Sequence, residues 1–361
     1  MEKLDDMIGD IYRNKRVFLT GHTGFKGAWM LSWLHMLGAE VKGYSLAPVG
    51  RQSLYNQING DKLCQSVIAD IRDKERLEKE IVNFKPDFIF HLAAQPLVRL
   101  SYDIPAETFE VNTLGTAFLL DAVIRLENSC RVIAITTDKV YENKEWHYPY
   151  RENDRLGGYD PYSASKAAAE IVISSYRNSF FNPKETGRHQ KAIASARAGN
   201  VIGGGDWAKD RIIPDIIRAL QKGEPVVIRN PRSVRPWQHV LEPLAGYLQL
   251  GTRLMEEPAV YADAWNFGPY QEDSIPVEEL AEQALCIWGS GRLEKPRLEG
   301  QPHEAGLLRL DIGKTIAELG WKPKMNARQA IEMTVRWYKE ADGAGAAELV
   351  GQDIATYNSL P

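Results

Sequence analysis

The chain has 361 residues, of which 44% are hydrophobic and 25% charged, a balance typical of a globular protein with two domains or a domain with a lobe. A formal net charge of −4 argues against a general nucleic-acid or membrane-surface partner. Three widely spaced cysteines and the lack of paired Cys/His motifs argue against a disulfide framework and a metal site. The first residues do not resemble a signal peptide and no apolar run is long enough to span a bilayer, so we expect a cytoplasmic protein.

The first half of the chain alternates short apolar segments with helical patterns. Such alternation predicts an α/β fold, with a doubly wound parallel sheet of the Rossmann type and helices on both of its faces. The predicted strands are 16–20, 41–44, 66–69, 87–91, 131–136 and 193–196, and the predicted helices are 24–37, 73–84, 105–126 and 161–180.

After residue 198 this rhythm is interrupted by segments rich in glycine and proline. We therefore predict a larger sheet domain at residues 1–198 and 239–268, and a smaller lobe at residues 199–238 and 269–361. The segment that follows Lys339 is weakly patterned, so we expect it to be loosely held.

A glycine loop lies between the first predicted strand and the first predicted helix. Its sequence is Thr-Gly-His-Thr-Gly-Phe-Lys-Gly at residues 20–27, and its spacing is GxxGxxG rather than GxGxxG. Glycines let the backbone approach a pyrophosphate, and the helix N-terminus offers it free N–H groups and a positive dipole end. The alternative is a plain tight turn, but the strand and helix on either side favour dinucleotide binding. The candidate binding residues are Gly21, Thr23, Gly24, Phe25 and Gly27.

Two later strand ends fit the same cofactor site. Asp70 and Ile71 follow the third strand and could hold an adenine ring. The run Leu92, Ala93, Ala94 and Gln95 follows the fourth strand, where small side chains would let a dinucleotide pass close to the backbone, although turn packing is the alternative. The end of the second strand has no clear acidic partner for a ribose hydroxyl, so it does not distinguish NAD from NADP.

Tyr162 and Lys166 form a YxxxK spacing on a predicted helix, where positions i and i+4 share a face. A nearby ammonium favours the phenolate, which can then take a proton from a sugar hydroxyl. The fifth predicted strand ends in Thr137, Asp138 and Lys139, at the sheet edge where doubly wound folds carry their chemistry. Thr137 could bond the reacting hydroxyl, and Asp138 and Lys139 offer an acid and a potential base. A strand-end turn with solvated charges is the alternative.

Taken together, these motifs resemble the extended short-chain dehydrogenase/reductase family, and in particular its sugar-nucleotide 4,6-dehydratases. The likeness covers roughly residues 10–340 and is carried by GHTGFKG (21–27), HLAAQPLVRLSY (91–102), TTDKVYEN (136–143), GGYDPYSASK (157–166), RAGNVIGGGDWAKDRIIPD (197–215) and RNPRSVRPWQHVLEPL (229–244).

The resemblance implies NAD as the cofactor, CDP-glucose as the substrate and a smaller C-terminal lobe that binds it. It also implies transient oxidation at C4, loss of water across C5 and C6, and return of hydride to C6. In related dehydratases an Asp-Glu pair supplies the acid and the base. Here Asp138 matches the acid, but Lys139 stands where the Glu would be, which leaves the identity of the C5 base open.

By the same resemblance the substrate-contact candidates are Asn200, Arg211, Arg235 and His303. Three arginines in the loop around Arg235 suit a diphosphate, although a solvated basic loop is the alternative. The resemblance also implies a homodimer, or a tetramer, formed through helices within 105–126 and 161–180. A sugar-nucleotide epimerase and a non-catalytic NAD-binding sensor remain as alternative functions.

Overall fold

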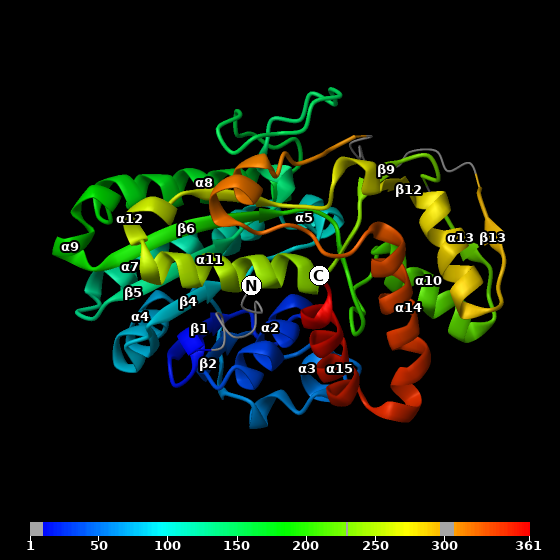
Figure 1. The fold of residues 1–361 in the computed structure, drawn as a ribbon, viewed down its shortest axis with the longest axis horizontal. Coiled ribbons are helices and arrows are strands. Elements are labelled where there is room, and N and C mark those ends of the chain that lie inside the picture. Colours follow the sequence, from blue (N-terminus) through cyan, green and yellow to red (C-terminus); the bar gives the residue numbers. More distant parts are fainter. Residues whose placement is uncertain (1–9, 229, 297–306) are drawn as a thin grey trace.

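A computed structural model describes residues 10–228, 230–296 and 307–361 (Figure 1). It contains a seven-stranded sheet with the order β11-β6-β5-β4-β1-β2-β3, in which all neighbouring strands run parallel. The strands are β1 (Arg16–Thr20), β2 (Glu40–Ser45), β3 (Gln65–Ile68), β4 (Phe88–His91), β5 (Cys130–Ile135), β6 (Lys191–Ala198) and β11 (Ala264–Phe267). The strand order reverses between β1 and β4, and ligands of such sheets bind beside this reversal at the carboxyl ends of the strands. The predicted Rossmann-type fold is therefore confirmed.

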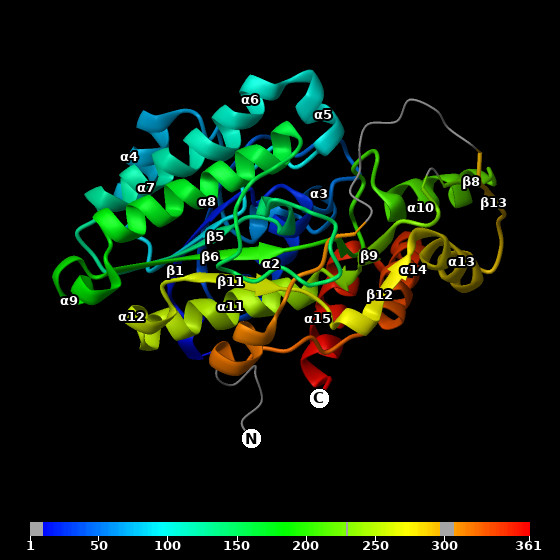
Figure 2. The same ribbon diagram turned by 90° about the horizontal axis from the view of Figure 1, so that it is seen from above.

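The two faces of the sheet are covered by separate groups of helices (Figure 2). Alternate residues of a strand point to opposite faces, and β1 follows this rule: Phe18 joins one buried apolar cluster, whereas Val17 and Leu19 join the other. The first cluster includes α4 (Lys74–Phe84), α7 (Gly115–Arg125) and α8 (Pro161–Ser179). The second includes α2 (Phe25–Met36), α11 (Leu241–Glu256), α14 (Ala327–Ala344) and α15 (Ala346–Ser359).

The predicted helix at residues 105–126 is divided in the structure. It consists of α6 (Pro105–Phe109), a π-helical turn η2 (Glu110–Leu114) and α7. The π turn points Asn112 inward, where its side-chain oxygen accepts a hydrogen bond from the Gln95 backbone N–H at 2.8 Å and its amide donates to the Ser165 hydroxyl at 2.9 Å. The turn thus ties the end of β4 to the helix that carries Tyr162.

Three two-stranded sheets and six further α-helices complete the described part of the chain. The small sheets are β7 (Val201–Ile202) with β10 (Gln238–His239), β9 (Val234–Pro236) with β12 (Ser274–Pro276), and β8 (Val226–Val227) with β13 (Leu293–Glu294). The remaining α-helices are α3 (Leu54–Gln57), α5 (Val98–Asp103), α9 (Thr186–His189), α10 (Ile212–Lys222), α12 (Pro258–Tyr261) and α13 (Val277–Trp288). β11 returns to the edge of the large sheet beside β6, while the exact division into two domains stays a prediction.

The prediction that the segment after Lys339 is loosely held is wrong. α14 continues to Ala344, and α15 then packs against α2, with the rings of Tyr357 and Trp33 5.9 Å apart in an edge-on arrangement. The buried Tyr357 hydroxyl also donates to the buried Glu242 carboxylate of α11 at 2.9 Å. Glycines made the local pattern look weak, but tertiary burial outweighs that low helix propensity.

Among the described residues, no helix combines the length and the apolar character needed to cross a bilayer.

Candidate active site

The glycine loop packs tightly against the end of β4. Gly21 has a φ of +74°, and a Cβ built on it would lie 2.8 Å from the Ala93 backbone nitrogen. A Cβ on Gly27 would lie 2.0 Å from the Gly21 carbonyl oxygen. Both positions therefore require glycine, because any side chain there would displace backbone.

Gly24 has a different role in the loop. It is the N-cap residue of α2, it provides no side-chain cap, and the first turn of the helix contains no acidic residue. A Cβ built on Gly24 would approach only the Gly21 carbonyl, at 3.3 Å. No acidic side chain of this first turn competes for the N–H groups of the helix end, which fits an anionic pyrophosphate.

Thr23 and Phe25 support the loop from its two sides. The Thr23 hydroxyl donates to the Leu46 carbonyl at 2.8 Å and lies 2.8 Å from the Ser45 hydroxyl, which ties the loop to the end of β2. The Phe25 ring lies beside Gly203, where a built Cβ would be 3.1 Å from it. Phe25 therefore connects the loop to the segment that follows β7.

The run after β4 is fixed to the same loop. Backbone N–H groups of Leu92 and Ala93 donate to the carbonyl and the hydroxyl of Thr20 at 3.2 and 3.1 Å. Gln95 is buried and its backbone N–H donates to Asn112, while Ala94, the residue before it, is half-buried. Small side chains therefore stand where a dinucleotide would pass across the strand ends.

Asp70 and Ile71 lie at the end of β3, on the outer side of the loop. Asp70 pairs with Arg72 at 2.6 Å, and its carbonyl accepts from the Tyr44 hydroxyl at 3.0 Å. Ile71 is buried against Gly115, where a built Cβ would be 2.9 Å from it. The residues therefore line the strand ends predicted to hold the cofactor, and this geometry fits a dinucleotide.

The candidate catalytic side chains converge at the end of β5 and the start of α8. Thr137 caps the short 3₁₀ turn Asp138–Val140, and its hydroxyl donates to Asp138 Oδ1 at 2.9 Å. α8 begins sharply because Asp160 caps it and Pro161 occupies its first turn, which places Tyr162 at its N-terminal end. Lys166 lies one turn further, and its Nζ donates to the Ile135 carbonyl at 3.3 Å.

Burial raises the pKa of Tyr162 to about 12, while a hydrogen bond with Thr137 acts in the opposite direction. The charge of Asp138 also raises this pKa, and the charge of Arg211 lowers it. Tyr162 therefore needs neighbouring cations to serve as a base near neutral pH. Lys166 was the candidate cation from the sequence, and the structure indicates Arg211 as a second one.

Asp138 is buried, and burial raises the pKa of its carboxyl group. The charges of Lys139, Arg235 and Lys26 and the bond from Thr137 oppose this rise. Its Oδ2 atom has no hydrogen-bond partner among the described residues. A buried carboxyl oxygen without a hydrogen-bond partner, on a group with a raised pKa, suits a carboxylic acid that keeps its proton and can donate it to a substrate.

Lys26 was not among the predicted site residues, although it lies inside the glycine-loop motif. Burial, together with the charges of Arg211 and Lys166, lowers its pKa to about 8, while the charge of Asp138 acts in the opposite direction. Together Lys26, Lys166 and Arg211 make a local cationic site in an acidic protein. Such a site fits the phosphates of a nucleotide ligand.

The substrate-contact candidates are distributed around this centre. Arg211 pairs with Asp206 at 2.8 Å, and Arg235 lies in β9 close enough to Asp138 to influence its pKa. The Asn200 carbonyl accepts from the Gln238 backbone N–H at 3.1 Å. His303 lies outside the described residues.

A pocket opens beside Asp138 at Gly199, where a built Cβ would be 2.9 Å from Asp138 Oδ2. It is lined by Gly199, Pro236, Gly268, Pro269, Gln271, Ser274, Arg309 and Leu310. Its residues come from segments far apart in the chain, so local sequence patterns gave no sign of it.

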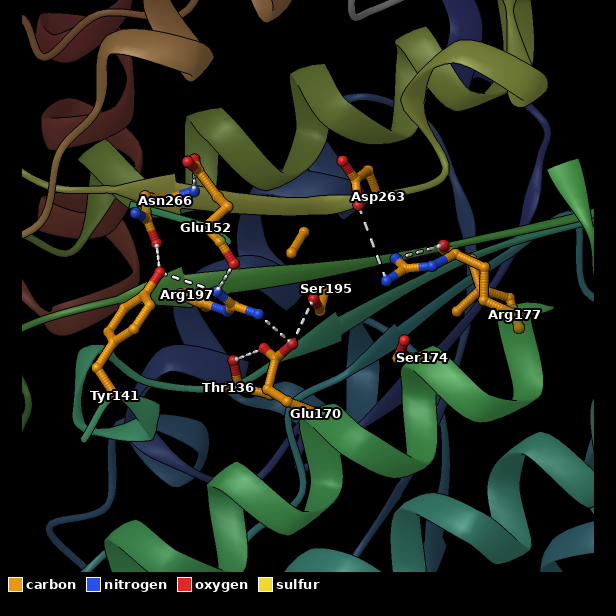
Figure 3. Close-up of polar contacts among 12 residues, drawn as sticks. Thr136, Tyr141, Glu152, Glu170, Ser174, Arg177, Ser195, Arg197, Asp263 and Asn266 are labelled. Carbon is orange, nitrogen blue, oxygen red and sulfur yellow. Dashed lines mark hydrogen bonds and ion pairs between the residues drawn. The ribbon is translucent and has the colours of Figure 1, made fainter. Parts of the chain in front are cut away.

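A buried polar network next to the catalytic side chains was also missed. Glu170, one turn beyond Lys166 on α8, contacts Thr136, Ser195 and Arg197 (Figure 3). The available signal was the spacing, because Tyr162, Lys166 and Glu170 follow one another at four-residue intervals and therefore share a helix face.

Comparison with known proteins places the chain among nucleotide-sugar enzymes. The family model described as GDP-mannose 4,6 dehydratase matches residues 18–267. The chain is 50% identical to a CDP-glucose 4,6-dehydratase of Salmonella typhimurium, over 91% of this chain and 92% of that protein. A dTDP-glucose 4,6-dehydratase from Streptomyces venezuelae, solved with NAD bound, is 25% identical over 91% of this chain and 98% of its own, with a TM-score of 0.76. An epimerase from Methanothermobacter thermautotrophicus shares the fold with a TM-score of 0.78, at 23% identity over 97% of each chain.

Proposed function

We propose that this chain, which belongs to the GDP-mannose 4,6-dehydratase family, is an NAD-dependent lyase that converts CDP-glucose to CDP-4-keto-6-deoxyglucose. The observation that carries the proposal is the convergence of Thr137, Asp138 and Tyr162 at the strand ends beside a glycine loop that fits a dinucleotide. The 50% identity with a CDP-glucose 4,6-dehydratase supports the choice of nucleotide and sugar.

The first step needs a base at the C4 hydroxyl of the hexose. Tyr162 takes the proton, Thr137 bonds the reacting oxygen, and the Lys166 ammonium stabilises the phenolate. NAD held by the glycine loop and the strand ends would supply a hydride acceptor for C4 and a hydride donor for C6, and would be unchanged over the cycle.

The second step removes water. The C4 ketone acidifies the C5 hydrogen, a base removes that proton, and Asp138 protonates the departing C6 hydroxyl. The same base then returns a proton to C5 as hydride reaches C6. The raised pKa of Asp138 supports this acid role. Lys139 is half-buried next to Asp138 and is our candidate for the C5 base, which requires its neutral form.

The glycine-loop and strand-end residues predicted above would bind NAD, and Asn200, Arg211, Arg235 and His303 would contact the substrate. Arg211 and Arg235 support this because their charges reach Tyr162 and Asp138 respectively. A guanidinium at each position suits a diphosphate.

The outer helices support a homodimer or a tetramer. Five large apolar side chains are exposed along α6, η2, α7 and α8 and at the C-cap of α8, namely Phe109, Leu114, Ile124, Ile171 and Phe180. Burial of these residues against a second copy would remove apolar surface from water. Light scattering of the wild type and of Ile171→Glu tests this, and a wild-type monomer would refute it.

Product mass tests the proposed reaction. The purified protein is incubated separately with CDP-, dTDP-, GDP- and UDP-glucose, and the products are analysed by mass spectrometry. We expect a product lighter by one water with CDP-glucose. A product of unchanged mass would instead identify an epimerase, and retained NAD without any turnover would identify a non-catalytic NAD-binding protein.

A further inference from the structure

Glu170 occupies an unusual place on the catalytic helix. It lies on the same buried face of α8 as Tyr162 and Lys166, and its side chain is only 2% exposed. A buried carboxylate is costly unless each oxygen is hydrogen-bonded and the charge is paired. Its surroundings therefore decide whether it can remain charged.

Three donors hold the Glu170 carboxylate, one directly after β5 and two on β6 (Figure 3). The Thr136 hydroxyl donates to Oε1 at 2.6 Å, and the Ser195 hydroxyl and Arg197 Nη2 both donate to Oε2 at 2.8 Å. Burial raises the pKa of Glu170, but Arg197 and these bonds outweigh burial and lower it overall. Glu170 is therefore an anion with a fixed orientation.

Arg197 is itself fixed from the other side. Its Nη1 donates to the Tyr141 hydroxyl and to the Glu152 carbonyl, both at 2.8 Å, and its guanidinium lies 5.1 Å from the Tyr141 ring centre. The Tyr141 hydroxyl in turn donates to Asn266 Oδ1 of β11 at 2.7 Å. The ion pair is thus anchored across three neighbouring strands, and neither partner is free to move toward solvent.

Lys166 is the charged group next to this anion on α8. Burial lowers the pKa of Lys166 to about 8, and Glu170 acts in the opposite direction by favouring the ammonium. The other ionisable groups around Lys166 are Tyr162 on α8, Lys26 on α2, His91 on β4 and, beyond the Glu170 carboxylate, Arg197 on β6. Lys26 and Lys166 repel each other, and burial lowers the pKa of His91 to about 3, which leaves His91 neutral. Among these described groups, Glu170 is the one that favours a cationic Lys166.

We propose that Glu170 is a positioning residue that keeps Lys166 cationic and aimed at Tyr162, and that Thr136, Ser195 and Arg197 hold its carboxylate for this purpose. The proposal rests on the proposed function, because that function gives Lys166 its role. Without the Glu170 charge, Lys166 loses its proton at lower pH and no longer stabilises the Tyr162 phenolate.

The test compares Glu170→Gln with the wild type in the full-length, NAD-bound protein. With CDP-glucose, we expect the alkaline limb of the kcat/KM profile to move to lower pH, and kcat to fall by up to about 100-fold. Glu170→Asp keeps the charge but shortens the side chain. Its alkaline limb should stay at the wild-type position while its kcat is reduced.

A distant buried carboxylate provides the matched control. Asp353 of α15 is fully buried and pairs with Arg336 of α14, but burial raises its pKa to about 7. Asp353→Asn therefore alters a buried ion pair far from Lys166 without the loss of stability at pH 7 that is expected of Glu170→Gln. It should leave the pH profile unchanged. If Glu170→Gln is folded and its alkaline limb coincides with that of the wild type, Glu170 is a structural residue and the proposal is overturned.

A second measurement separates this proposal from the proposed function. In protein labelled with 13C at lysine Cε, the Lys166 signal is assigned by its loss in Lys166→Arg, and its titration needs no substrate. We expect Lys166 to titrate at lower pH in Glu170→Gln, and an unchanged titration would overturn the proposal even if CDP-glucose is dehydrated. If Glu170→Gln does not fold, the Thr136→Val/Ser195→Ala double variant replaces it in both measurements, because it removes two of the three donors.

Discussion

Two buried carboxylates near the end of β5 have opposite surroundings. Glu170 has every oxygen bonded and a guanidinium partner, so its pKa is lowered in spite of burial. Asp138 has one hydrogen-bonded oxygen and one without a partner among the described residues, so burial raises its pKa. Burial alone therefore does not set the protonation state of a carboxyl group. The number of hydrogen-bond donors around it decides whether it is a fixed anion or an acid that keeps its proton.

The largest effect should come from the acid side of this comparison. Asp138→Asn keeps the shape of the side chain but cannot donate a carboxylic proton. We expect C4 oxidation to remain and elimination of water to fall by about 10²- to 10⁴-fold. Rapid-quench analysis should then find a 4-keto-hexose nucleotide that retains its C6 hydroxyl, and normal dehydration by the variant would exclude Asp138 as the acid.

Lys139→Ala sharpens the comparison by separating the acid from the base. We expect C4 oxidation to persist while exchange of the C5 hydrogen with solvent deuterium falls by about 10²-fold. Mass spectrometry of substrate recovered from D₂O measures this exchange. Exchange at the wild-type rate would mean that another residue removes the C5 proton.

Stability should respond in opposite directions at the two sites. The pKa of Asp138 is raised in the folded protein, so ionisation of this carboxyl costs stability as pH rises. Asp138→Asn removes that cost and should raise the Tm at pH 7 more than at acidic pH. The pKa of Glu170 is lowered, so the ionised carboxylate stabilises the fold at pH 7 and this contribution is lost as pH falls. Glu170→Gln should therefore lower the Tm at pH 7. Calorimetry at several pH values would contradict this comparison if both variants shifted the Tm in the same direction.

The smallest effect should come from a single donor to Glu170. Ser195→Ala removes one bond at 2.8 Å and leaves the charge pair intact. We expect a loss of roughly 1 kcal/mol in unfolding free energy and an unchanged alkaline limb. Chemical denaturation and the pH profile measure the two quantities. A shifted limb would mean that the Ser195 hydroxyl is required to hold the anion.

Much of the fold was predictable because the signal is local. The apolar strands, the glycine loop and the YxxxK spacing each occupy a few consecutive residues. The structure confirms the predicted alternation of strands and helices along the chain and the parallel sheet. The partners of Glu170 were not predictable in this way. Ser195 and Arg197 meet it only because β5 pairs with β6 in a register that sets Ile135 against Ala196, which no short-range pattern specifies.

Helix α15 has a practical consequence for handling this protein. It covers α2, whose first turn faces the proposed pyrophosphate cradle, so the last residues of the chain brace the cofactor site from behind. Trimming the chain after residue 345 to obtain a shorter version would therefore strip that support. Such a preparation should lose its NAD during purification, even though every residue of the glycine loop remains in place.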